Sequence, residues 1–281
     1  MDRDKTCIVI QGNVRKSTYK CIKEFQRNGY YVIFSCWQDC IVPAEWHNEK
    51  LKIIKTTKPS KRGLNNRNLL RVSANRGVKE AKRKGFQYII KWRSDIIPGD
   101  NFLKNLENEK FITPIEKGKI IIPNFRCFKF TPRLYSSIND MVQIGRSSAM
   151  DILWGLDMMD MDKEYNGPKQ IKDWPVQMIE SFYCNESELL ANIIARKLQA
   201  KVDDLYDIDE QLYDDTFDKT FELSSYQDFD MIWLNEKLRK RSLITTVDRG
   251  CRTNIEYMAR VAMIEYKKLN WMDKLRLKIR N

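Results

Sequence analysis

Short apolar runs alternate with helical segments over the first hundred residues, and this alternation constrains the fold most strongly. Strand-like runs rich in β-branched residues are predicted at residues 6–11, 30–36, 51–56 and 87–93. Segments with helical spacing are predicted at residues 17–28 and 65–84. Strands separated by helices form mainly parallel sheets with helices packed on their faces. The sequence therefore predicts an α/β fold.

The remainder of the chain is less regular. Further strands are predicted at residues 119–123 and 141–145, and further helices at residues 147–159 and 186–199. The acidic stretch 203–218 is predicted to be a solvated surface segment. We expect one domain over residues 1–250, followed by a basic amphipathic helical extension at residues 251–281.

The predicted extension has one apolar helical face, which includes Met258, Leu269 and Met272, and many lysines and arginines elsewhere. Such a helix can lie on anionic lipid, with Trp271 at the headgroup level, or it can pack on the protein core. The chain begins without the hydrophobic core of a signal peptide, and no apolar run approaches the ~20 residues of a membrane span. We therefore expect a cytoplasmic protein whose membrane contact, if any, is peripheral, at the inner face of the cell membrane.

The composition limits the chemistry that the chain can perform. His47 is the single histidine, which excludes a metal site with two histidines. The 7 cysteines are scattered without a Cys-x-x-Cys pair, so we expect them to be reduced packing residues. An enzyme of this composition must use carboxylates for acid-base chemistry and for metal binding. The net charge of +12 favours anionic partners such as nucleotides, nucleic acid or an acidic membrane face.

Three charged residues stand at the end of an otherwise buried strand. Alternation places Lys91, Arg93 and Asp95 on one face of the strand, near the carboxyl end where parallel α/β sheets bind their ligands. Asp95 is a candidate ligand for Mg²⁺ or Mn²⁺, because these cations prefer oxygen ligands and share their coordination shell with substrate phosphates. Lys91 and Arg93 could then neutralise the remaining phosphate charge. The alternative is an internal ion pair between the aspartate and one of the two cations.

Other candidate residues lie at predicted element ends. Asn66 and Arg67, at the start of the helix predicted from residue 65, could bind an anion or a nucleotide, or could merely cap the helix. Glu186 and Glu188 begin another predicted helix and could act as a general base or as helix caps. Asp140, just before the strand predicted at residues 141–145, is a further base candidate, with an Asx-turn as its alternative.

Six short motifs occur in a recognisable order. They are IVIQG at 8–12, SCW at 35–37, NNRN at 65–68, YIIKWRSD at 88–95, NDMVQIG at 139–145 and LW at 153–154. In this order they resemble the WavE-type lipopolysaccharide synthesis family, a group of GT-A-like glycosyltransferases that build lipopolysaccharide or capsule. The resemblance covers roughly residues 6–200, and its most distinctive parts are the Lys-x-Arg-Ser-Asp element and the early Gln-Gly pair.

The resemblance implies a GT-A-like, Rossmann-type sheet that binds a nucleotide sugar. The donor site would be lined by Gln11, Gly12, Trp37, Asn66, Arg67 and Arg93. Asp95 would stand where GT-A enzymes place the metal-binding Asp-x-Asp motif, although Arg93 replaces the first aspartate and could supply part of the cation's charge. Where the family has a Pro-Glu pair after Tyr183, this chain has Glu186 and Glu188, which leaves the counterpart glutamate open.

The activity implied is transfer of a hexose-like sugar from a nucleoside diphosphate sugar, with a UDP-sugar favoured, to a hydroxyl of a lipopolysaccharide, O-antigen or capsule glycan that is carried on a lipid. A divalent cation at Asp95, with Arg93 and Lys91 nearby, would stabilise the leaving diphosphate.

Two alternative functions remain. A sugar nucleotidyltransferase would need a more glycine-rich first loop than Gly12 alone supplies. A nucleic-acid-binding protein would use the positive charge, but the acidic stretch 203–218 argues against that class, and we expect no nucleic-acid partner.

Overall fold

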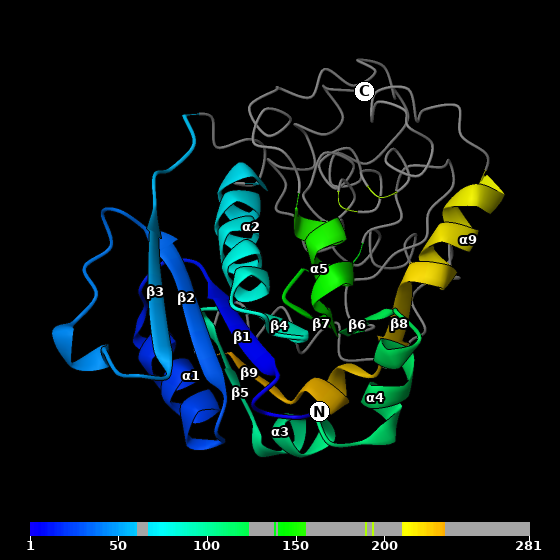
Figure 1. The fold of residues 1–281 in the computed structure, drawn as a ribbon, viewed down its shortest axis with the longest axis horizontal. Helices are drawn as coiled ribbons and strands as arrows, with labels where there is room; N and C mark the ends of the chain where they lie inside the picture. The colour runs from blue at the N-terminus through cyan, green and yellow to red at the C-terminus, as the bar shows by residue number, and fades with distance from the viewer. Residues whose placement is uncertain are drawn as a thin grey trace, which may run out of the picture.

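The computed structural model (Figure 1) describes residues 1–60, 67–123, 138, 140–155, 189, 193 and 210–233. In these ranges the protein is an α/β structure with a mixed, mostly parallel seven-stranded sheet and flanking helices, which confirms the predicted fold class. The predicted helix at 186–199 and the extension at 251–281 lie outside these ranges, apart from residues 189 and 193, which are helical.

The main sheet has the strand order β3-β2-β1-β4-β7-β6-β8. Its strands are β1 (Thr6–Gln11), β2 (Tyr31–Trp37), β3 (Leu51–Thr56), β4 (Tyr88–Arg93), β6 (Ile120–Pro123), β7 (Val142–Arg146) and β8 (Phe221–Ser224). The first four strands run parallel to one another, whereas β7 is antiparallel to both of its neighbours. A small second sheet pairs β5 (Ile96–Pro98) with β9 (Met231–Trp233) in antiparallel fashion. Every strand predicted from the sequence is present, and its bounds agree to within one residue.

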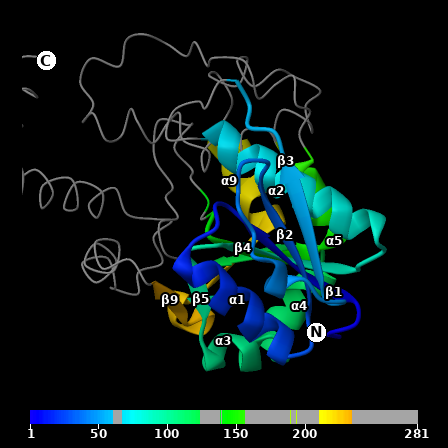
Figure 2. The same cartoon turned by 90° about the vertical axis from the view of Figure 1, so that its left-hand side faces the viewer.

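Helices cover both faces of the main sheet (Figure 2). They are α1 (Lys16–Arg27), α2 (Arg67–Arg83), α3 (Asp100–Asn105), α4 (Glu109–Glu116), α5 (Ser147–Trp154) and α9 (Glu210–Thr220), with short 3₁₀ turns at Ala44–Trp46 and Tyr226–Phe229. Side chains of β1 alternate between two cores, because Cys7 and Val9 pack with α2 and α5 while Ile8 and Ile10 pack with α1 and α3. Burial on both faces explains why β1 reads as a continuous apolar run.

Two predictions, one of a helix and one of a solvated segment, need correction. The helix predicted at 147–159 ends at Trp154, where Gly155 caps it. The prediction of a solvated segment at 203–218 is wrong for its second half, because α9 begins at Glu210 and both Thr216 and Phe217 are buried. The Phe217 ring lies 5.3 Å, centroid to centroid, from the ring of Phe221 in β8, and both belong to the core under α2 and α5. Burial of one apolar face therefore outweighs the acidic composition of this segment.

The described helices include none with the length and apolar character needed to cross a bilayer.

Four cysteines fall in the described ranges, and all of them are free thiols: Cys7, Cys21, Cys36 and Cys40. Burial raises the pKa of the Cys36 thiol to about 12, so this group stays protonated at neutral pH.

Helix α2 approaches the sheet closely because residue 77 is a glycine. A Cβ atom at Gly77 would lie 2.3 Å from Cγ1 of Val9 and 3.5 Å from Cβ of Ser35. Val9 belongs to β1 and Ser35 to β2, so the glycine sets the spacing between α2 and these two strands.

We expect Gly77→Ala to lower the free energy of unfolding by about 1–3 kcal/mol, because the added methyl overpacks the interface with Val9. The free energy is measured by urea denaturation of the purified protein. The double variant Gly77→Ala/Val9→Ala should recover part of the loss. If Gly77 had no such contact, its replacement by alanine would raise the free energy of unfolding by about 0.5–1 kcal/mol, as in other helix interiors. A stabilised Gly77→Ala variant would therefore show that α2 does not pack on β1 as described.

Candidate functional site

The carboxyl ends of β1 and β4 lie side by side at the centre of the sheet. From β1 the chain adds β2 and β3 on one side of the sheet, and it then adds β4 on the other side of β1. The order in which strands are added therefore changes direction between β1 and β4. Open α/β sheets bind ligands at such a switch point. The register pairs Gln11 of β1 with Arg93 of β4 and with Ser35 of β2. Two segments at these strand ends, residues 11–15 from β1 and residues 93–95 from β4, are together called the rim.

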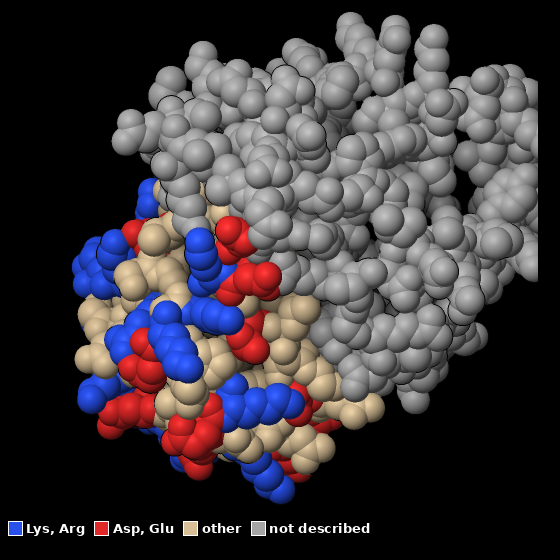
Figure 3. All heavy atoms as spheres, turned by 90° about the vertical axis from the view of Figure 1, so that its right-hand side faces the viewer, with Lys and Arg blue, Asp and Glu red and all other residues tan. Residues whose placement is uncertain are grey.

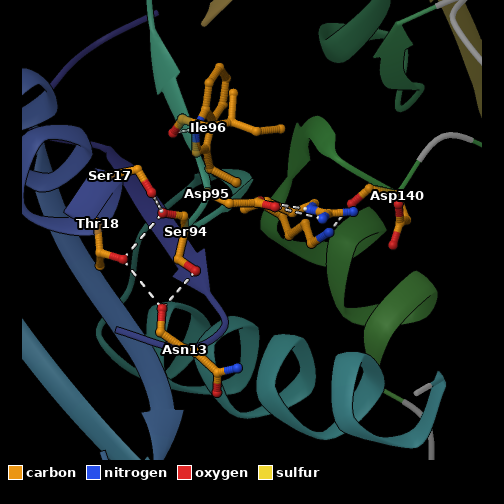
Figure 4. Close-up of polar contacts among 10 residues, drawn as sticks. Asn13, Ser17, Thr18, Ser94, Asp95, Ile96 and Asp140 are labelled. Atoms are coloured by element: carbon orange, nitrogen blue, oxygen red, sulfur yellow. Dashed lines mark hydrogen bonds and ion pairs between the residues drawn. The ribbon is translucent and has the colours of Figure 1, made fainter. Parts of the chain in front are cut away.

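Ser94 joins the two halves of the rim through its backbone and its hydroxyl (Figure 4). Its amide donates to the carbonyl oxygen of Gln11 at 3.0 Å, and its Oγ donates to the carbonyl oxygen of Asn13 at 2.9 Å. The hydroxyls of Ser17 and Thr18, in the first turn of α1, donate to the Ser94 carbonyl at 2.9 and 3.2 Å. These bonds hold the loop after β1, the start of α1 and the turn after β4 as one unit.

Gly12 lets the two segments approach this closely. Its φ of +131° is a backbone conformation that residues with side chains rarely adopt. A Cβ atom here would lie 2.5 Å from Oγ of Ser94, and the Gly12 amide donates to the carbonyl of Ser35 at 3.1 Å. The early Gln-Gly pair is therefore explained by the contact between the loop after β1 and the turn after β4.

Arg93 and Asp95 form a two-point ion pair at the end of β4. Nε of Arg93 donates to Oδ1 of Asp95 at 3.0 Å, and Nη2 donates to Oδ2 at 2.8 Å. The Arg93 side chain is 30% exposed and that of Asp95 9%. Burial raises the pKa of the Asp95 carboxyl, but the hydrogen bonds and charge of Arg93, with the charge of Arg15, outweigh it and hold the pKa below its ordinary value of 3.8. Asp95 is therefore ionised at neutral pH.

This arrangement does not fit a divalent cation at Asp95. Both carboxylate oxygens accept N–H groups of Arg93, so a cation would have to displace the guanidinium. Within the described ranges, no group of three or more His, Cys, Asp or Glu side chains is placed to hold a metal ion. The structure thus contains the internal ion pair that the sequence left open as an alternative, and metal binding by Asp95 stays a prediction.

Lys91 lies in the interior beside β7. The side chain is fully buried, and its Nζ donates to the backbone carbonyl of Asp140 and lies 5.1 Å from the ring centroid of Trp154. Trp154 in turn donates its indole N–H to Oε1 of Gln143 at 2.6 Å. Lys91 therefore fixes the backbone that leads into β7, and its predicted contact with a phosphate stays a prediction.

Asp140 is brought to the same end of the sheet by the antiparallel pairing of β7 with β4 (Figure 4). Trp92 pairs with Val142, so Asp140 lies just past the end of β4. The residue is only 5% exposed, yet its side-chain carboxylate accepts no hydrogen bond and forms no ion pair with another residue in the described ranges. Its oxygens are not among the fully buried polar atoms that lack a partner, so a donor group can still approach this carboxylate.

The other predicted residues are placed less uniformly. Gln11 is buried, and its Oε1 accepts the hydroxyl of Ser73 in α2 at 2.9 Å. Trp37 ends β2 but is 3% exposed and packs against Val72 of α2. Arg67 begins α2, as expected for a helix starting near residue 65. The candidate residues outside the described ranges are Asn66, Glu186 and Glu188.

Sequence reasoning placed Ser94 in the Lys-x-Arg-Ser-Asp element but missed the hydrogen bonds that join the segments. Ser94, Ser17 and Thr18 act through hydroxyl groups at the rim, and Arg15 adds a positive charge from the loop after β1. The Ser-Thr pair at the predicted start of α1 was an available signal, since such residues favour helix N-termini. Nothing in the spacing indicated that their partner would be a carbonyl in the turn after β4.

Charges of both signs are mixed on the face toward β8 (Figure 3). Lys119 lies 2.8 Å from Glu222, and Lys110 lies 2.5 Å from Asp228. Proteins that bind nucleic acid use basic patches or stripes of one sign. The described part of this face does not have that character.

No protein-family model matches the chain, and no curated protein sequence matches it. The WavE-type resemblance therefore stays a prediction.

Solved structures with distant likeness include glycosyltransferases and nucleotidyltransferases. One is a glycosyltransferase involved in glycosylation of the major capsid of PBCV-1, which is 13% identical with a TM-score of 0.32. The match covers 54% of this chain and 65% of that chain, so this chain spans just under two thirds of the length of that protein. A cytidylyltransferase from Leptospira borgpetersenii is 13% identical over 80% of this chain and 97% of its own, with a TM-score of 0.36. The galactosyltransferase LgtC, solved with donor and acceptor sugar analogues, is 8% identical over 90% of this chain and 99% of its own, with a TM-score of 0.36. These values are too low to assign an activity, so the site rests on the side chains of this chain.

We expect Asp95→Asn to lower the free energy of unfolding by about 1–2 kcal/mol near neutral pH, a value reduced because Arg93 is partly exposed. The pKa of Asp95 in the folded protein lies below its ordinary value of 3.8. The ion pair therefore stabilises the fold fully above pH 3.8, and this stabilisation is lost as the pH falls through the lower folded-state pKa. Urea denaturation at a series of pH values should therefore show wild type and variant converging only in acid. The exposed Asp39, paired with Lys58, is a control in which Asp39→Asn should have a smaller effect. A difference that is unchanged in acid would contradict the ion pair.

Proposed function

We propose that the protein is a nucleotide-sugar-dependent glycosyltransferase whose donor binds at the rim. The observation that supports this most is the meeting of two kinds of group at the switch point of the sheet. Arg93 and Arg15 supply positive charge there, and Asp140 supplies a carboxylate that accepts no hydrogen bond from the described residues. Glycosyl transfer needs both, because the leaving diphosphate gains negative charge while the acceptor hydroxyl loses a proton.

In this proposal the rim holds the diphosphate of the donor. Gly12 has no side chain, so Ser94 can bring the turn after β4 against the loop after β1, and the two segments can face the same ligand. The guanidinium of Arg93, held by Asp95, stabilises the charge that develops on the diphosphate as the glycosidic bond breaks. Because Ser94 ties both halves of the rim together, these groups keep their positions before the ligand arrives, as electrostatic stabilisation requires.

Asp140 is our choice for the general base among the three predicted carboxylates. It lies just past the end of β4, and Lys91 holds its backbone carbonyl, which fixes where the residue leaves the sheet. No described residue donates a hydrogen bond to its side chain, so the carboxylate oxygens can accept one from an acceptor hydroxyl. Glu186 and Glu188 are the alternatives.

The finer parts of the proposal come from the sequence resemblance. They are membership of the WavE-type family, a UDP-sugar donor, and a lipid-linked lipopolysaccharide, O-antigen or capsule glycan as acceptor. The resemblance also implies donor contacts by Trp37, Asn66 and Arg67, whereas the basic amphipathic pattern of residues 251–281 predicts peripheral membrane contact. Mn²⁺ or Mg²⁺ at Asp95 is left out of the proposal, because both oxygens of this carboxylate accept N–H groups of Arg93. No step above depends on them.

We expect Asp140→Asn to retain donor binding and to lose turnover. A panel of UDP-, GDP-, CMP- and ADP-sugars is first screened by thermal shift, since a ligand of the native state raises the melting temperature. Slow donor hydrolysis, with water as the acceptor, then reports turnover through release of the nucleotide. The variant should lose about 10²–10⁴-fold in rate, the usual contribution of a general base, with a nearly unchanged dissociation constant.

Asp151→Asn is the matched control, because Asp151 lies in α5 and pairs with Lys82 away from the rim. Full turnover by Asp140→Asn would move the base to another residue and leave the donor site intact. Failure of every nucleotide sugar to bind would contradict the proposed function itself. Release of pyrophosphate from a nucleoside triphosphate and a sugar phosphate would identify a nucleotidyltransferase instead.

A further inference from the structure

Two arginines from different elements bring positive charge to one carboxylate at the rim. Arg93 comes from the end of β4 and holds both oxygens of Asp95. Arg15 comes from the loop after β1, and its charge also acts on Asp95. We propose that Arg15 and Arg93 together bind the diphosphate of a nucleotide directly, without a bridging metal ion. This inference rests on the proposed function, because it assumes that a nucleoside diphosphate occupies the rim.

The position of Arg15 is set by the hydrogen bonds that join the rim. Its backbone amide donates to Oγ1 of Thr18 at 2.9 Å, and Thr18 donates to the carbonyl of Ser94 at 3.2 Å. Arg15 is therefore fixed at its backbone relative to the turn that carries Arg93 and Asp95. Its side chain is exposed, and its guanidinium forms no ion pair or hydrogen bond with the other described residues. It can turn toward a ligand at the rim without breaking an existing contact.

The charge balance favours an anion at this place. The carboxylate of Asp95 faces two arginines, and that of Asp140 lies past the end of β4 beside the buried Lys91. These three cations and two carboxylates together carry one net positive charge. Guanidinium groups bind phosphate oxygens through paired N–H groups, which gives both charge and geometry. A diphosphate has oxygens enough to contact two guanidinium groups at once, which a single phosphate could do less well.

The competing arrangement places a divalent cation between Asp95 and the diphosphate. It requires Asp95 to give up both bonds from Arg93, and the described ranges offer no cluster of acidic side chains to complete the coordination shell. The two arrangements make opposite predictions about chelation. Removal of divalent cations abolishes binding through a metal bridge but leaves direct binding by arginines intact.

The test is isothermal titration calorimetry of the full chain with UDP, GDP and inorganic pyrophosphate, each in EDTA and in excess Mn²⁺. We expect at least one nucleoside diphosphate to bind with the same dissociation constant in both conditions. Arg15→Ala should raise that constant about tenfold or more, as expected for loss of a hydrogen bond between charged groups. Arg27→Ala is the matched control, because Arg27 is an exposed arginine at the other end of the same helix and should leave the constant unchanged.

Binding that requires Mn²⁺, or binding in EDTA that Arg15→Ala leaves unchanged, would overturn this inference while the donor site stands. Absence of nucleoside diphosphate binding in both conditions would overturn the proposed function as well. Arg15 is exposed, so its replacement should leave the protein folded, and the melting temperature of the variant checks this.

Discussion

The hydrogen bonds around Ser94 are the interaction on which the site depends. One residue uses its amide, its hydroxyl and its carbonyl to join the end of β1, the start of α1 and the turn after β4. The absence of a side chain at Gly12 makes the approach possible. Without this junction Arg15 and Arg93 would belong to two independent loops, and the charge they bring to Asp95 would not be held in one place.

A second, buried set of polar contacts places Asp140. Lys91 of β4 is fully buried beside β7 and the ring of Trp154, and it donates to the Asp140 carbonyl. Trp154 is itself fixed by its bond to Gln143. A buried charge is costly without such partners, so its presence at the centre of the sheet is consistent with a role in shaping the site. Lys91 thus holds the backbone of Asp140 from within the sheet, while Arg15 and Arg93 lie at the carboxyl ends of β1 and β4.

The sequence predicted the strands and the rim well, because buried parallel strands are short apolar runs that end at recognisable residues. Gln11, Gly12, Arg93 and Asp95 meet as the α/β topology requires. The bond of Lys91 to Asp140 could not be predicted, since it depends on the antiparallel register of β7, which no local pattern encodes. The ion pair of Arg93 with Asp95 was only one of two open alternatives. Helix α9 was missed because the buried face that includes Phe217 is a small part of an acidic segment.

The central claim, that a nucleoside diphosphate binds at the carboxyl ends of β1 and β4, is tested most directly by its effect on individual backbone amides. Titration of ¹⁵N-labelled protein with the nucleotide that binds in calorimetry should move the amide resonances of Gly12 and Ser94. The resonances of Gly29 and Gly85, which precede β2 and β4 at the opposite end of the sheet, should stay in place. Movement of Gly29 and Gly85 with Gly12 and Ser94 unchanged would contradict the account.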